Sequence, residues 1–148
     1  TFNILCVTSF PNLLEKILEW RVKYNKVNKT DQFQMVRFDT PYLKEPLQYD
    51  INILPKEEFL PYMYESLKFI EDNTDDQDPH KFSKVEFERF NRVVKYMEST
   101  TYDKIKLAEG RRDFYNWFSA LDHRRGINFV ETFPEMEQFF LMCKKLNG

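Results

Sequence analysis

Polar side chains that could meet a ligand follow a short apolar run in the first third of the chain. The run at residues 35–38 is followed by Asp39 and Thr40, and Tyr42 comes after Pro41. A residue before proline is disfavoured in a helix, so this point predicts the end of an extended segment. Ligands of α/β proteins usually bind beyond the carboxyl ends of strands, so Asp39, Thr40 and Tyr42 form a candidate binding site. The alternative is a polar turn whose carboxylate accepts backbone N–H groups.

A second group of polar side chains surrounds the end of a predicted helix. Arg124 and Arg125 are adjacent, Asn128 follows, and the pair Arg111 and Arg112 precedes them on the same helix. Guanidinium groups are forked donors that suit phosphate or carboxylate. Arg124, Arg125 and Asn128 are therefore the second candidate binding site. The alternative is that the arginines cap the helix end and form ion pairs with nearby acids.

Residue types alone assign no catalytic residue. His123 could titrate near neutral pH, but no paired nucleophile accompanies it, and local spacing assembles no Ser/His/Asp triad. The acidic run at residues 71–79 lacks the glycine and distal glutamate of a calcium-binding loop. It predicts a solvated linker and no metal site.

Composition excludes several classes of protein. A chain of 148 residues with 42% hydrophobic and 17% aromatic residues can bury a proper core, so it is not disordered. The net charge of −2 provides no global field for nucleic acid, although local patches remain possible. The absence of a window of about 18 apolar residues predicts no membrane span, and the start has no signal-peptide pattern, so a cytoplasmic protein is expected. Cys6 and Cys143 lie in apolar surroundings and predict reduced core thiols.

Hydrophobic patterning predicts an α/β fold in the first 54 residues. The apolar run at residues 3–9 predicts a buried parallel strand, and residues 33–38 predict a second one. Between them, residues 13–20 carry apolar side chains at helical spacing. Strand, helix and strand predict a right-handed βαβ unit. Because two strands make a poor sheet, further strands are expected from residues 50–54 or from a partner chain.

The hydrophobic spacing and capping signals of the remaining residues, 55–148, predict a helical lobe of about four helices. Capping boxes are predicted to begin at Ser83 and Thr132, and Gly126 is expected to end a helix. Gly110 lies inside a helical pattern, which it weakens by about 1 kcal/mol relative to alanine. The expected helices cover about residues 55–70, 83–97 and 102–123, and a last helix opens at the Thr132 capping box and carries apolar residues as far as Cys143.

Two motifs resemble the later portion of radical S-adenosylmethionine proteins of the twitch-domain type, many of them uncharacterised. They are RFDTPYLKEP at residues 37–46 and HRRGINFVETFPEM at residues 123–136, and residues 113–122 fit the same pattern. The amino-terminal portion of such proteins carries a C-x-x-x-C-x-x-C loop that binds a [4Fe–4S] cluster. The cluster reduces S-adenosylmethionine to a radical within a partial βα barrel.

The resemblance implies that this chain is the C-terminal part of such an enzyme and is not catalytic by itself. The chain has no three-cysteine loop, so S-adenosylmethionine and [4Fe–4S] are implied only for a longer parent protein. Residues 1–54 would be the last strands of the barrel, with Asp39 and Thr40 at its rim. Residues 55–148 would form a substrate-side lobe. The first residue, Thr1, also suggests a trimmed product or a piece of something longer.

Two other functions remain open. The chain could be a non-catalytic binding module that uses its arginines for an anionic partner such as RNA. It could also be a structural interaction protein whose aromatic helices are only core. The expected partners are the remainder of a parent chain or a partner subunit, with a small molecule or peptide as substrate.

Overall fold

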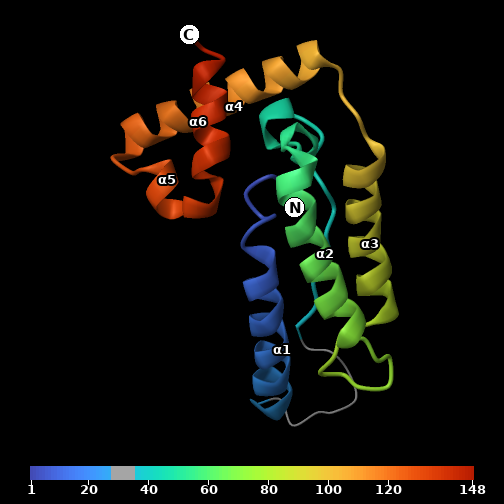
Figure 1. The fold of residues 1–148 in the computed structure, drawn as a ribbon. Coiled ribbons are helices and arrows are strands. Elements are labelled where there is room, and N and C mark those ends of the chain that lie inside the picture. Colours follow the sequence, from blue (N-terminus) through green and yellow to red (C-terminus); the bar gives the residue numbers. More distant parts are fainter. Residues whose placement is uncertain (28–35) are drawn as a thin grey trace.

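The computed structural model describes residues 1–27 and 36–148, and this part of the chain is all-helical and contains no strand (Figure 1). Short 3₁₀ turns separate several of the helices. The α-helices are α1 (Phe10–Val27), α2 (Lys56–Asp72), α3 (Lys84–Ser99), α4 (Lys104–Arg125), α5 (Phe129–Thr132) and α6 (Glu137–Lys145). The 3₁₀ turns are η1 (Leu47–Tyr49), η2 (Ile51–Ile53) and η3 (Pro134–Met136).

The predicted strand at residues 3–9 is wrong, because these residues form consecutive turns that lead into α1. The Cys6 N–H donates to the Asn3 carbonyl over 2.9 Å, and the Phe10 N–H donates to the Cys6 carbonyl over the same distance. Apolar side chains recur every three or four positions, which is helical spacing, and continue through the helix. These buried residues are Ile4, Val7, Phe10, Leu14 and Ile17.

The second predicted strand is not found at residues 36–38, and residues 33–35 of that prediction lie outside the described residues. Side chains form the hydrogen bonds with these backbone groups that a neighbouring strand would otherwise form. The Val36 carbonyl accepts from Arg21 Nε over 2.8 Å, and the Phe38 N–H donates to Glu86 Oε2 over 3.3 Å. Because these groups are satisfied without a ladder, the segment needs no sheet.

Residues 50–54 are also not extended. They contain η2, and Asp50 caps it by accepting the Asn52 N–H on Oδ1 over 2.9 Å. The predicted α/β class and its βαβ unit are therefore wrong, and so are the barrel strands that the resemblance implied for residues 1–54. A parallel contact near the amino terminus is an isolated bridge between Phe2 and Tyr42, which is too short to be a strand.

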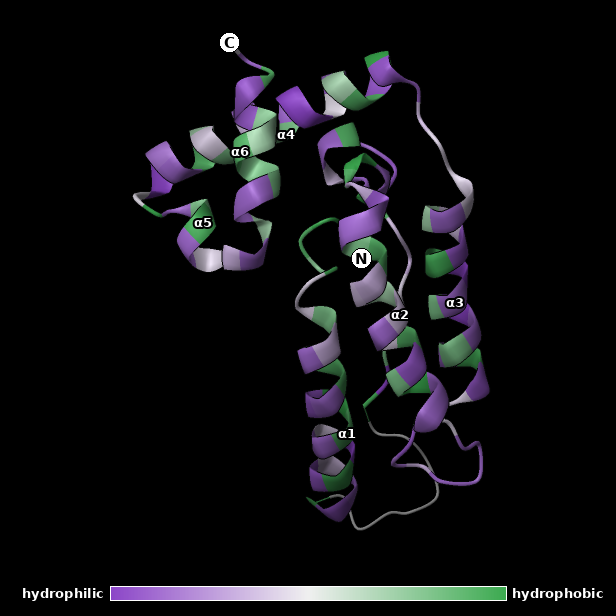
Figure 2. Cartoon of the chain, in the orientation of Figure 1, coloured by the Kyte–Doolittle hydropathy of each residue, from purple (hydrophilic) through white to green (hydrophobic). Residues whose placement is uncertain are grey.

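Helices α1, α2 and α3 form a bundle in which α2 packs against both neighbours. Hydrophobic residues of α3 face α2 and hydrophilic residues cover its outer side (Figure 2). The boundary predicted after residue 54 runs through this bundle. Arg21 and Glu86, both buried, form an ion pair of 2.5 Å that joins α1 to α3 inside it.

Helix α4 crosses the end of the bundle, and α6 packs against it (Figure 1). Aromatic side chains fill the space between α4, α5 and α6. Phe114 is fully buried, and the centroid of its ring lies 4.7 Å from the ring centroid of Phe118 and 5.0 Å from that of Phe139. No helix among the described residues is long and apolar enough to cross a membrane.

Two of the predicted helix ends are confirmed. Ser83 and Glu86 form the predicted capping box at the start of α3, and Gly126 ends α4 in the left-handed conformation with φ of 62°. The capping box predicted at Thr132 is wrong. Its hydroxyl donates to the carbonyl of Asn128, and α6 begins only after η3.

We expect Gly110→Ala to reduce the free energy of unfolding by about 1 kcal/mol, although alanine has a higher helix propensity than glycine. A Cβ at this position of α4 would lie 2.8 Å from Ile53 Cγ2 and 2.9 Å from Leu47 Cγ, so η1 and η2 would have to shift. Urea unfolding measures the change. The control is Ala120→Gly at an exposed position of α4, which should cost about 1 kcal/mol through propensity alone. A gain in stability for Gly110→Ala would show that this close approach has no cost.

Candidate functional site

Trp117 projects from α4 toward η1 and is 42% exposed, although it is one of the largest apolar side chains of the protein. Its indole Nε1–H donates to the Tyr49 hydroxyl over 2.8 Å. This bond holds the ring in place, and Trp117 lines two hollows in the surface. The exposed tryptophan is therefore a wall shared by two candidate ligand sites.

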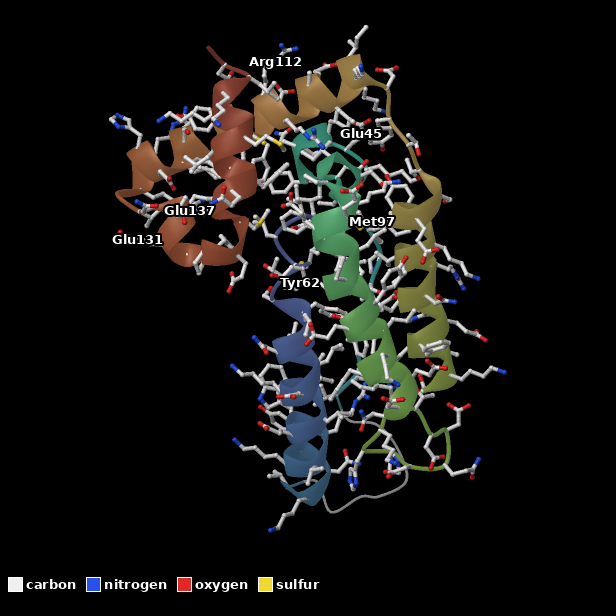
Figure 3. The ribbon with its side chains drawn as sticks, viewed as in Figure 1. Glu45, Tyr62, Met97, Arg112, Glu131 and Glu137 are labelled. Atoms are coloured by element: carbon white, nitrogen blue, oxygen red, sulfur yellow. The ribbon has the colours of Figure 1, made fainter. Side chains whose placement is uncertain are left out.

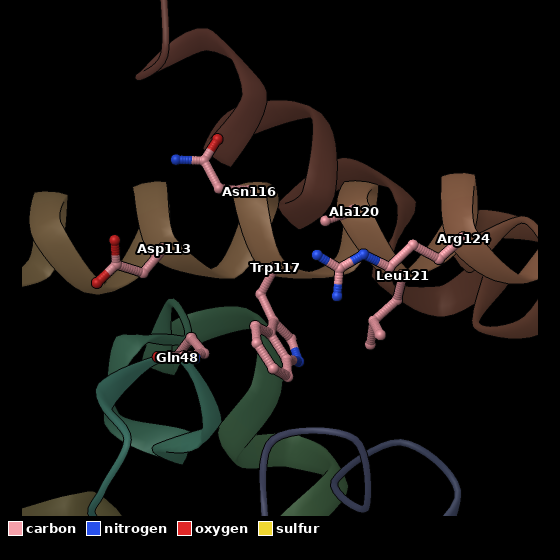
Figure 4. A pocket seen from close by; sticks show the side chains of 7 residues that line it. All are labelled: Gln48, Asp113, Asn116, Trp117, Ala120, Leu121 and Arg124. Carbon is pink, nitrogen blue, oxygen red and sulfur yellow. The ribbon is translucent and has the colours of Figure 1, made fainter.

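The first hollow has a volume of about 310 Å³ (Figure 4). The Arg124 side chain extends back along α4 in the direction of Trp117 (Figure 4). Asp113 lies at the other end, eleven residues earlier on the helix, which corresponds to roughly 16 Å along its axis. The remaining lining residues are Gln48, Asn116, Ala120 and Leu121.

The second hollow, of about 370 Å³, also has Trp117 and Leu121 in its lining. Its charged lining residues are Asp122 and Arg125. The Asp122 carboxylate accepts the Phe129 N–H over 3.0 Å, which anchors α5 and leaves Arg125 as the cation of this hollow. The apolar lining comes from Leu5, Phe118, Leu121, Ile127 and Phe133, among others.

Of the four arginines in the predicted patch, Arg124 and Arg125 lie at the two hollows. Neither forms an ion pair with a described residue, so the ion pairs of the alternative interpretation are absent from this part of the chain. Arg111 donates from Nε to the Ile53 carbonyl over 2.8 Å, and burial lowers the pKa of its guanidinium. Arg112 points outward, away from the bundle (Figure 3). The patch is therefore the pair Arg124 and Arg125.

Asn128 has a structural role as a helix cap. It is the N-cap of α5, and its Oδ1 accepts the Val130 N–H over 3.0 Å and the Glu131 N–H over 3.3 Å. This cap orders the loop beside the second hollow. Asn128 is not among the residues that line either hollow.

The other predicted site residues, Asp39, Thr40 and Tyr42, lie together in a third hollow of about 310 Å³. Arg89 and Arg92 of α3 complete its lining. The predicted strand is absent, but the side chains are brought together by packing against a helix. Sequence reasoning missed the two arginines, although their spacing of three on a predicted helix places them on one face.

A buried carboxylate network was also missed. Asp50 is fully buried, and its Oδ2 accepts hydrogen bonds from the hydroxyls of Tyr96 and Tyr102. Burial, and then the hydrogen bond to Asp50, raises the pKa of Tyr102, and burial also raises the pKa of Tyr96. The network joins η2 to α3 and to the start of α4. We interpret the network as structural, because none of its members lines a hollow described above.

Cys6 and Cys143 are both free thiols. Burial raises the pKa of the Cys143 thiol to about 12, although nearby Arg111 lowers it. A thiol with such a pKa is an unreactive core group at neutral pH. Within residues 1–27 and 36–148, no three histidine, cysteine or acidic side chains gather as metal ligands. His123 lies exposed near the end of α4.

No known protein family, curated protein or solved structure matches this chain. The resemblance to radical S-adenosylmethionine proteins stays a prediction, since these comparisons neither support nor exclude it.

Proposed function

We propose that this protein is a binding module whose cleft around Trp117 holds a small organic anion with an apolar body. The observation that carries the proposal is that an exposed tryptophan lines two hollows, each with an arginine that has no ion pair among the described residues. Binding sites for small molecules typically combine an apolar wall with a few convergent polar groups.

The apolar body fits the second hollow best. This hollow presents aromatic surface from Trp117, Phe118 and Phe133, which lie on α4 and on the segment after α5. Burying an apolar group there gains about 25 cal/mol for each Å² of surface removed from water. Its volume of about 370 Å³ is in the range of sites for small ligands.

The acidic group of the ligand would face Arg124 or Arg125. A hydrogen bond between an ionised pair contributes about 1.5–3 kcal/mol, more than one between neutral groups. Asp113 does not cancel this charge, because it lies at the far end of the first hollow. Asp122 is already engaged by the Phe129 N–H.

The test compares two fluorescent probes that differ only in charge. Anilinonaphthalene sulfonate carries an aromatic body and an anionic group, and phenylnaphthylamine is its uncharged counterpart. We expect saturable binding of the sulfonate, about tenfold weaker in Arg124→Gln/Arg125→Gln, while the uncharged probe binds both proteins alike. Trp117→Leu should weaken both probes because it removes the shared wall.

Matched controls exist for each substitution. Arg112→Gln removes an arginine of α4 that points outward, and Trp20→Phe removes a tryptophan that is 41% exposed on α1. Both should leave binding unchanged. In the Trp20→Phe protein, Trp117 is the one remaining tryptophan, so its quenching reports on the cleft directly. If Arg112→Gln weakened the sulfonate as much as the double variant does, the proposal would be overturned.

RNA remains a predicted partner, but the net charge of −2 and the small size of the two hollows favour a small anion. Enzymatic activity by kinship to radical S-adenosylmethionine proteins also stays a prediction, and no contact in the cleft supports it.

A further inference from the structure

The third hollow, between residues 39–42 and α3, has the composition of an anion site. Two guanidinium groups, from Arg89 and Arg92, face a single carboxylate, that of Asp39. Arg89 Nη1 lies 3.4 Å from Asp39 Oδ2, whereas Arg92 makes no ion pair with any residue that the structure describes. Glu88, four residues before Arg92 on α3, also makes no ion pair within those residues. The hollow therefore has an excess of positive charge.

Unused hydrogen-bonding capacity lies in the same place. Only 6% of Thr40 is exposed, and its buried side-chain hydroxyl finds no partner among the described residues. A buried hydroxyl without a partner is costly, so it marks a position where a further acceptor would be favourable. The Thr40 N–H is used, because it donates to Asp39 Oδ1 over 2.8 Å.

The Asp39 carboxylate occupies the place in this hollow that a bound anion would take. Its two oxygens meet the Arg89 guanidinium and the Thr40 N–H, which are donors of the kind that hold an oxyanion. The carboxylate is 54% exposed and its ion pair is long, so solvent screens the attraction and little holds it in place. A ligand with more charge and more acceptor oxygens can displace it.

Further positive charge lies next to the hollow. Tyr42, which lines it, stacks on Tyr96 with ring centroids 4.2 Å apart, and the Lys44 ammonium lies 5.6 Å and 5.3 Å from these two rings. An ammonium over two aromatic rings is held by their electron-rich faces. The cations at this face therefore come both from α3 and from the segment that packs on it.

We propose that this hollow is a binding site for a phosphate monoester group, with Asp39 as the internal group that occupies it when no phosphate is bound. A phosphate monoester carries nearly two negative charges at neutral pH and three strong acceptor oxygens. It can engage Arg89 and Arg92 together, which one carboxylate does not do here. The Thr40 N–H and hydroxyl are the additional donors once Asp39 has moved away.

The experiment is a titration with inorganic phosphate at constant ionic strength, followed by ¹H–¹⁵N NMR of the Thr40 amide and the arginine Nε–H groups. We expect saturable shifts of the Thr40 amide and of Arg92 Nε–H. Arg92→Gln should weaken binding about tenfold, because a hydrogen bond between charged groups is lost. Asp39→Ala should strengthen it about three- to fivefold, because the competing carboxylate is gone.

The opposite signs of these two effects make the proposal falsifiable. Arg112→Gln is the control, since it removes an equal charge at a distant point of α4 and should change nothing. Shifts that grow linearly with phosphate, weaker binding by Asp39→Ala, or unchanged binding by Arg92→Gln would each overturn it. A chloride titration of the same ionic strength separates a specific site from screening.

A second arm distinguishes the source of the phosphate. A short peptide with one phosphoserine is compared with inorganic phosphate and with the unphosphorylated peptide. Tighter binding of the phosphopeptide supports a phosphorylated protein as the partner, and equal binding supports a free phosphate compound. Equal binding of the two peptides, with no response to inorganic phosphate, would also overturn the site. Because this hollow shares no lining residue with the Trp117 cleft, its test fails or succeeds independently of the probe experiment.

Discussion

Arg21→Met is expected to reduce the free energy of unfolding by about 3–5 kcal/mol, which is a large part of the stability of an ordinary domain. Arg21 is fully buried in α1, and its guanidinium donates to the Val36 and Lys81 carbonyls as well as to Glu86. The substitution leaves a buried carboxylate without its counter-charge and two carbonyls without donors. Chemical denaturation followed by circular dichroism measures the loss.

Two further variants separate the ion pair from the simple loss of packing. Replacing both partners in Arg21→Met/Glu86→Leu removes both buried charges, so the double variant should be more stable than the sum of the two single losses implies. Lys68→Met is the surface control, because Lys68 and Asp72 form an exposed pair of 3.2 Å that contributes less than about 1 kcal/mol. A loss for Arg21→Met no larger than that of Lys68→Met would contradict the role assigned to the buried pair.

Asp50→Ala is expected to cost about 2–4 kcal/mol. The substitution removes the cap of η2 and leaves the hydroxyls of Tyr96 and Tyr102 without their acceptor. Asp103→Ala is the matched control, since Asp103 caps α4 by accepting the Lys106 N–H over 2.8 Å and has no tyrosine partner in that role. It should cost only about 1 kcal/mol. Equal losses for the two variants would show that the tyrosine hydrogen bonds contribute nothing.

The same network predicts a pH dependence. The folded state raises the pKa of Tyr96 and Tyr102, first through burial, so it keeps their protons while the unfolded chain releases them. The contribution is complete below the unfolded pKa of about 10 and is lost as the pH rises above it. Denaturation at increasing pH should therefore show falling stability from about pH 10. Tyr96→Phe/Tyr102→Phe should flatten this fall, and an unchanged fall would assign it to other groups.

The helices of the second half were predictable because their signals are local. The capping box of Ser83 and Glu86 depends on residues three apart, and Gly126 ends α4 through its own backbone conformation. The capping box predicted at Thr132 failed for a tertiary reason. Asn128 caps a short helix first, so the chain makes one extra turn before α6.

The predicted strands failed because an apolar run does not distinguish a strand from turns that precede a helix. Ile4 and Val7 have the spacing of α1, and the continuation of this spacing at Phe10 was the available signal. For residues 36–38 no local signal existed. Their backbone groups bond to Arg21 and Glu86, which lie 15 and 48 residues away in the chain.

The sequence by itself determined the start of α3 and the end of α4, and it indicated candidate side chains for an anion site. It identified Asp39, Thr40, Tyr42, Arg124 and Arg125, and each of these lines a hollow. Only the tertiary structure decided their partners. Arg89 and Arg92 meet residues 39–42 because this segment lies against α3, and Trp117 reaches Tyr49 because α4 packs on η1. These contacts join residues about 50 to 70 positions apart, and their closeness depends on the burial of the whole core, which local spacing does not encode.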